Sequence, residues 1–294
     1  MPNRPYVSTA AFKAHPTYLD LDGLRSGSSS SDEQDAELTN ILLMASQWAD
    51  NEIDMPLGAH SWTQRCRSRV DRQGNLRFHA EHSPVLSVGA VGYGYSPTTL
   101  TTAAGPPAWV EDGANLVVAL SASGGAWSGS LQFGAPTSAG EVFVQAQYAA
   151  GRVATILSQP ALAGATTLTV EDPTGILPGE SYRIWEPGVE ETITIADTWT
   201  PTTPGTAPAP TAVPLANPAL FVHTAGSDVS GLTADQRLAV THYATSLLMR
   251  PDVAAESSYP GAAPSSSVRS KQGRTAEWYA QEARRILASY GRIR

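Results

Sequence analysis

Apolar side chains recur at three- and four-residue spacing between residues 31 and 55, which is the period of one face of an α-helix. This stripe consists of Leu38, Ile41, Leu42, Ala45, Trp48, Ala49 and Ile53. Ser31, followed three residues later by Gln34, is typical of an N-cap with a capping box. Because each large side chain contributes roughly 1.5–3 kcal/mol when buried, we expect this helix to be covered by another part of the chain or by a neighbouring copy.

Two further helical patterns lie near the C-terminus. The first begins at Thr233, which forms a second capping box with Gln236, and is expected to end at Pro251. The second runs over residues 275–290. Its apolar side consists of Tyr279, Ala283, Ile286, Leu287 and Tyr290. Residues 252–274, which are rich in Ser, Pro and Ala, are interpreted as a mobile linker.

Residues 60–70 alternate with period two, which is the pattern of a β-strand. One face carries Trp62, Gln64, Cys66, Ser68 and Val70, and the other carries Arg65, Arg67 and Arg69. Two interpretations of this arginine row stay open: it is a solvated face, or it meets an acidic neighbouring subunit. Residues 71–75 have the composition of a hairpin turn, and residues 76–79 form the returning strand.

Further strands are predicted at residues 85–95, 109–111, 116–120, 130–133 and 142–148. Together they make a β-rich body over residues 57–150. A second β unit is expected over residues 151–230, with strands near residues 165–170, 182–185 and 190–195. Within it, residues 198–218 are dominated by Pro, Thr and Ala, and this composition predicts a loop or polyproline II segment that buries little.

The predicted fold class is therefore α+β. A small helical bundle is formed by the N-terminal helix, residues 31–56, and two C-terminal helices, residues 231–251 and 275–294, with a large antiparallel β region inserted between them. Residues 1–30 are expected to form an N-terminal arm, with one helical turn at residues 8–13.

The charge of the chain is unevenly distributed. The formal net charge is −8, but residues 269–294 carry seven basic and two acidic side chains. An acidic body is not expected to bind DNA tightly, because that affinity comes from neutralising phosphates, although it suits a passage through which DNA slides.

The absence of an apolar run of membrane-spanning length and of a signal-peptide pattern predicts a protein made in the cytoplasm with no membrane partner. Cys66 is the single cysteine, which excludes an intrachain disulfide.

No pattern of catalytic, cofactor-binding or metal-binding residues emerges. His79-Ala80-Glu81 imitates the start of a zinc deaminase signature, but the paired cysteines are missing. His79 and His82 lack further ligands at suitable spacing. Glu190 and Glu191 are adjacent in a predicted strand, so we expect them on opposite faces. The residues Trp48, Trp62, Trp109, Trp185 and Trp278 lie in amphipathic elements and are interpreted as core or interface anchors.

Three blocks of the sequence resemble a known family. They are RPYVSTAAFKAHPTYLDL with QDAELTNILLMASQWADNEIDMPL, then GNLRFHAEHSPVLSV, and finally VQAQYAAGRVATIL with AGATTLTVEDPTGILPGESYRIWEPGVEETITIA and HTAGSDVSGLTADQRLAVTHYATSLLM. In this order they are similar to the head-to-tail connector, or adaptor, proteins of long-tailed bacteriophages, especially those of actinobacterial hosts. Residues 98–140 and the proline-rich segment match nothing in that family.

The resemblance implies a structural virion protein in the neck of the particle. Such a protein forms a homo-oligomeric ring, dodecameric in this family, which docks on the portal protein, extends the DNA channel without binding DNA specifically, and carries the next neck or tail protein. The family's C-terminal segment commonly docks into the portal. Carried onto this sequence, the portal interface consists of Trp278, Tyr279, Arg284, Arg285, Ile286 and Tyr290. Candidates for contacts between subunits are Arg65, Arg67, Arg69 and Trp48.

Two other classes of function stay open. The strand-rich middle and the many aromatic residues also fit a carbohydrate- or receptor-binding β module of a phage tail, which predicts exposed aromatic side chains on one β face. An enzyme that acts on cell wall or nucleic acid is suggested by His79, Glu81 and His82 alone.

Overall fold

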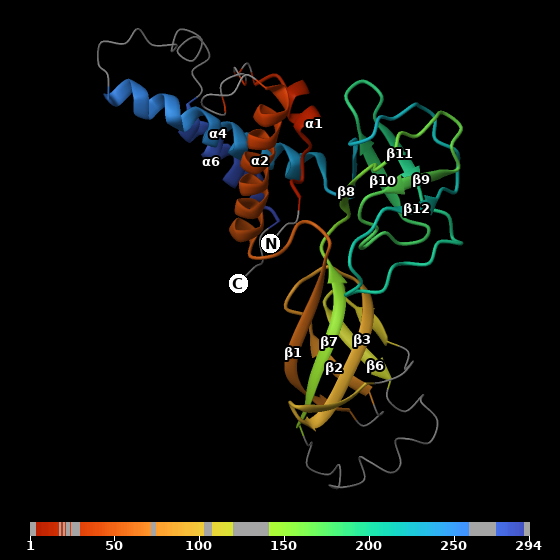
Figure 1. The fold of residues 1–294 in the computed structure, drawn as a ribbon. Helices are drawn as coiled ribbons and strands as arrows, with labels where there is room; N and C mark the ends of the chain where they lie inside the picture. The colour runs from red at the N-terminus through yellow and green to blue at the C-terminus, as the bar shows by residue number, and fades with distance from the viewer. Residues whose placement is uncertain are drawn as a thin grey trace.

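The computed structural model describes residues 4–17, 19, 21, 24, 30–71, 75–102, 108–119, 141–258 and 275–290. It has three parts: a helical bundle, a first β unit (residues 57–150) and a second β unit (residues 151–230) (Figure 1). Both ends of the described chain lie in the helical bundle, and the two β units form the segment between them. The predicted α+β class with a large antiparallel β region is confirmed.

The helical bundle contains α1 (Thr9–Ala14), α2 (Ser31–Ile53), α4 (Ala234–Ser258) and α6 (Ala276–Leu287). Its core includes Phe12 from α1, Leu38, Leu42, Ala45, Ala49 and Ile53 from α2, Ala239, Val240 and Ala244 from α4, and Ala283 and Leu287 from α6. The predicted stripe of the first long helix is thus covered within the same chain. None of the helices in the described residues has an apolar stretch long enough to cross a lipid bilayer.

The helix ends agree with the sequence in part. Thr233 and Gln236 form the expected reciprocal capping box: each backbone nitrogen donates to the other side chain, at 3.1 and 3.3 Å. The expected N-cap at Ser31 is wrong, because Ser30 is the N-cap and makes no capping hydrogen bond with its side chain. The expected end of α4 at Pro251 is also wrong, since the helix continues to Ser258. Residues 252–258 of the predicted linker are therefore helical, and its residues 259–274 lie outside the described residues. A proline removes one helical hydrogen bond, but the alanines that follow favour helix.

The first β unit is a seven-stranded antiparallel sheet in the order β4-β3-β7-β1-β2-β6-β5. Its strands are β1 (His60–Val70), β2 (Asn75–His79), β3 (Val85–Ser96), β4 (Thr99–Thr102), β5 (Ala108–Glu111), β6 (Asn115–Ala119) and β7 (Glu141–Ala150). The sheet encloses a core that includes Leu76, Leu116, Val118, Val142, Val144 and Tyr148. The predicted alternation in β1 is confirmed by its burial pattern. The strand predicted at residues 130–133 lies outside the described residues.

The second β unit contains a four-stranded sheet, β11-β10-β13-β8, and a two-stranded sheet, β12-β9. The strands are β8 (Ala154–Ile156), β9 (Thr167–Val170), β10 (Ser181–Trp185), β11 (Glu191–Thr194), β12 (Thr211–Pro214) and β13 (Asp228–Ser230). The prediction that the proline-rich segment buries little is wrong in its last part. There β12 pairs with β9, and both Val213 and Leu215 enter the core, because pairing with a distant strand satisfies the backbone.

A polar network joins the N-terminal arm to the helices and to the second β unit. The guanidinium of Arg237 on α4 donates to the carbonyl oxygen of Tyr6 at 2.8 Å and to the carboxylate of Asp228 on β13 at 2.6 Å. The Ser8 backbone nitrogen donates to the same carboxylate at 3.0 Å, and the Tyr6 nitrogen donates to the Ser46 hydroxyl at 2.9 Å. The arm is therefore part of the folded body.

Candidate interaction surfaces

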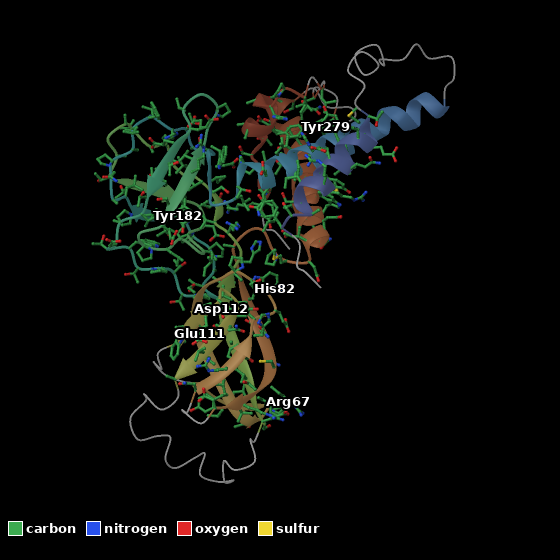
Figure 2. The ribbon with its side chains drawn as sticks, turned by 180° about the vertical axis from the view of Figure 1, so that it is seen from behind. Arg67, His82, Glu111, Asp112, Tyr182 and Tyr279 are labelled. Carbon is green, nitrogen blue, oxygen red and sulfur yellow. The ribbon has the colours of Figure 1, made fainter. Side chains whose placement is uncertain are left out.

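The predicted C-terminal interface residues divide between the two faces of α6. Tyr279 is buried, and Ile286 and Tyr290 pack against the core of the helical bundle. The hydroxyls of Tyr290 and Thr233 lie 3.2 Å apart. Figure 2 shows Tyr279 within the helical part, where its ring meets that of His242 edge to face, with the centroids 5.4 Å apart. These three residues hold α6 in its own chain.

The outer face of α6 presents the remaining predicted residues. Trp278 is 37% exposed, and the side chains of Arg284 and Arg285 are largely in solvent. Arg285 donates two hydrogen bonds, at 2.8 and 2.6 Å, to the carboxylate of Glu282, and these bonds lower the pKa of Glu282. Arg284 lies 3.7 Å from Glu52 of α2. The Trp278 ring also meets that of His242 on α4, with the centroids 5.9 Å apart. An exposed tryptophan and two exposed arginines on one helix are a composition enriched at protein interfaces.

The arginine row of β1 lies on the outer face of the first β unit, as predicted. Arg65 donates to the Gln145 side chain at 2.8 Å, and Arg67 and Arg69 lie 3.7 and 3.4 Å from Glu141. These side chains remain mostly exposed, so their ion pairs contribute little stability. Figure 2 shows Arg67 at the end of the first β unit that is remote from the helices.

Beside this row the outer face contains an apolar hollow of about 270 Å³. It is lined by Arg65, Cys66, Arg67, Pro97, Leu100, Phe143 and Val144. In the strand pairing, Phe143 on β7 stands opposite Arg67 on β1 and opposite Gly94 on β3, and the backbone of β4 lies over Gly94. An added Cβ at Gly94 would lie 2.5 Å from the Thr99 carbonyl oxygen. The Arg67 guanidinium covers the Phe143 ring at 4.7 Å.

The second β unit carries an exposed apolar loop, which we define as Leu162, Leu220, Phe221 and Val222. Their exposed fractions are 70%, 73%, 44% and 55%. The two chain segments are joined by reciprocal backbone hydrogen bonds between Ala161 and His223, at 2.9 and 2.8 Å. Exposed apolar groups that gather on an ordered backbone often mark a binding surface. Three consecutive apolar residues after a proline-rich stretch are the sequence signal of this loop, which hydrophobic periodicity does not reveal.

A buried His-Glu cluster holds this apolar loop in place. The ring nitrogens of His223, which is fully buried, lie 2.9 Å from Glu186 and 3.2 Å from Glu191. Glu191 also accepts a hydrogen bond from the Leu220 backbone nitrogen at 2.8 Å. Burial by itself raises the pKa of Glu186, but hydrogen bonds from Thr224, His223 and Ser227 outweigh it and lower that pKa. Glu190 is exposed while Glu191 is buried, which confirms that the adjacent glutamates face opposite sides.

The residues considered for metal or catalytic chemistry do not form a common site. The His79 ring lies 3.1 Å from the Asn115 side chain on the surface, whereas the His82 ring packs against Trp62 with centroids 3.7 Å apart. Figure 2 labels His82 at the end of the first β unit nearer to the helices. Within the described residues, no group of three or more His, Cys, Asp or Glu side chains is suited to holding a metal ion. Burial and the nearby charge of Glu81 raise the pKa of the Cys66 thiol.

Trp48, a candidate for contacts between subunits, is stacked on Tyr243 of α4, with ring centroids 3.7 Å apart and planes 5° from parallel. Its ring is therefore engaged within the chain.

Comparison of the chain with models of protein families, with curated proteins and with solved structures finds no match in any of the three.

Proposed function

We propose that this protein is a structural head-to-tail connector, or adaptor, of a long-tailed bacteriophage. It would form a homo-oligomeric ring in the neck of the virion, dock on the portal protein, extend the DNA channel and carry the next neck or tail protein. The order of the three sequence blocks supports this proposal. The acidic body supports it as well, because a channel that attracted phosphates would retain the DNA.

The observation that carries the proposal is the two-faced packing of α6. Its inner face, with Ala283 and Leu287, is buried in the helical bundle. Its outer face presents Trp278, Arg284 and Arg285 to solvent. We assign portal contact to these three outer residues. Tyr279, Ile286 and Tyr290 then act by holding the helix in position.

Point variants on the outer face test this assignment better than deletion of residues 269–294, which would also remove buried parts of the core. Trp278→Ala is expected to weaken binding to a portal protein of the same virus at least about tenfold, as for an interface anchor. Trp109→Ala is the matched control: Trp109 is 39% exposed, against 37% for Trp278, but lies on β5. Binding is measured by interferometry, and negative-stain images of the mixture give the ring size.

The proposed role of α6 is wrong if Trp278→Ala and Arg284→Glu/Arg285→Glu bind the portal as the unchanged protein does, with unaltered urea unfolding.

The alternative of a carbohydrate- or receptor-binding module needs aromatic side chains on one β face. In the described part of the chain the exposed aromatic residues Trp109, Phe221 and Trp278 lie on three different parts of the fold. No observation therefore favours that alternative.

A further inference from the structure

We infer that the apolar loop of the second β unit (Leu162, Leu220, Phe221 and Val222) docks into the hollow on the outer face of the first β unit of a second copy of this chain. This inference rests on the proposed ring and names the surfaces that join its neighbouring subunits. The two surfaces lie on different units of one chain, and Figure 2 shows Arg67, at the hollow, far from Tyr182 of the second β unit. Each chain therefore carries both halves of the contact.

The apolar loop is shaped for insertion. Phe221 lies at its centre between Leu220 and Val222, and all three are exposed although their backbone is anchored. Anchoring comes from His223 between Glu186 and Glu191 and from the Glu191 bond to the Leu220 nitrogen. An ordered loop loses little conformational freedom on binding, so its apolar area contributes more fully to affinity.

The hollow is suited to receive this loop. Its volume of about 270 Å³ accommodates a side chain of the size of Phe, and Leu100, Phe143 and Pro97 supply apolar walls. Phe143 and Arg67 are paired across β7 and β1, so both side chains lie on the outer face, where they line the hollow. A bound aromatic ring would meet Phe143 and the guanidinium of Arg67, which already lies over an aromatic ring.

Charge complementarity favours a second copy as the occupant. The second β unit, residues 151–230, contains two arginines and eight acidic residues. Glu186 and Glu191 are enclosed with His223 beneath the apolar loop, whereas Glu190, the residue before Glu191, is exposed. The hollow is bordered by Arg65 and Arg67, with Arg69 next along the strand. Unlike charges around an apolar contact fix its orientation and speed association.

A contact between two different surfaces of identical chains is heterologous, and it closes into a ring when the rotation between copies allows. This gives a strict test with two variants of the full chain. Phe221→Asp removes the insertion but keeps the hollow, and Leu100→Arg blocks the hollow but keeps the insertion. Each variant alone is expected to self-associate at least about tenfold more weakly than the unchanged protein in sedimentation velocity. Mixed together, they should form a one-to-one dimer that grows no further.

Met44→Asp is the matched control, because Met44 is 54% exposed on α2, a helix that contributes no residue to either surface. It should self-associate like the unchanged protein. Far-UV circular dichroism and urea unfolding confirm that each variant is folded. The inference is overturned if either variant assembles normally, if the mixture stays monomeric, or if the unchanged protein shows no self-association either alone or on the portal. Portal binding of the same variants is measured separately, so failure of this contact is distinguishable from failure of the connector role.

Discussion

The phenolic oxygen of Tyr6 lies 2.8 and 2.9 Å from the two carboxylate oxygens of Asp50, and this contact fastens the N-terminal arm to the last turn of α2. Asp50 also accepts a hydrogen bond from the Leu57 nitrogen at 2.9 Å, where the chain leaves the helix for the first β unit. One carboxylate thus organises the point at which the arm, the helical bundle and the β region meet.

This carboxylate makes stability depend on pH. Burial raises the pKa of Asp50 from 3.8 to about 6, against the opposing effect of its hydrogen bonds with Leu57 and Tyr6. The folded protein therefore holds a proton on Asp50 more tightly than the unfolded chain does. That stabilisation is fully present below about pH 4 and is lost as the pH rises through about 6. The quantity to measure is the unfolding free energy of the unchanged protein minus that of Asp50→Asn. We expect this difference to fall by up to about 3 kcal/mol between about pH 4 and pH 7. Urea titrations of both proteins at both pH values measure the difference, and the same difference at both pH values would contradict the prediction.

Arg237 and Arg183 give a matched pair of substitutions. Both guanidinium groups lie over the Trp185 ring, at 5.0 and 4.8 Å, but Arg237 is buried with Asp228 while Arg183 is exposed. Arg237→Ala leaves the Asp228 carboxylate buried without its counter-ion, so we expect a loss of about 3–5 kcal/mol. Arg183→Ala should lose about 1 kcal/mol or less. Urea unfolding of both variants tests this, and equal losses would show that the buried ion pair is unimportant.

His223 is expected to control the order of the apolar loop. Replacement by Ala leaves Glu186 and Glu191 facing each other across an empty position, and we expect a loss of about 3 kcal/mol. Hydrogen exchange should accelerate in residues 219–224, since the bond from Leu220 to Glu191 depends on that glutamate staying in place. His79→Ala, on the surface, is the control and should change stability by about 0.5 kcal/mol or less. Unchanged exchange at residues 219–224 would contradict the supporting role of His223.

Gly151 lies at the passage between the two β units, with φ +115°, and an added Cβ would stand 2.2 Å from the Gly58 carbonyl oxygen. Gly151→Ala is therefore expected to cost more than about 3 kcal/mol or to prevent folding. Gly188 has φ +87° but open space around it, so Gly188→Ala should show only backbone strain of about 1–2 kcal/mol. Thermal and urea unfolding of the two variants compare steric overlap with conformational strain.

Predictions from the sequence succeeded where the physical cause is local. The alternation in β1 shows itself over eleven residues, because successive side chains of a strand point to opposite faces. The capping box of Thr233 and Gln236 involves atoms three residues apart. Helix α6 begins directly after Thr275, whose side chain accepts a hydrogen bond from the Trp278 nitrogen, and this start agrees with the predicted one.

Other features depended on distant residues. The strand β12 in the proline-rich segment forms because Thr211–Pro214 pairs with Thr167–Val170, and β13 forms between β8 and β10. Neither strand has a periodic pattern long enough to be recognised by itself. The sequence predicts an N-terminal arm over residues 1–30, but only the tertiary structure shows that Tyr6 and Val7 of this arm are buried in one core with residues of α2 and α4.

The sequence by itself determined the α+β class, the apolar faces of α2 and α6 and the two faces of β1, since spacing along the chain sets which side chains share a face. The face of α4 that enters the core, with Ala239, Val240 and Ala244, was not predicted. The tertiary structure alone decided that Tyr279 faces inward while Trp278 faces outward, that His223 is enclosed by Glu186 and Glu191, and that Pro97, Leu100 and Phe143 line one hollow. These relationships join residues brought together by packing and strand pairing, and short-range periodicity carries no information about which distant segments will meet.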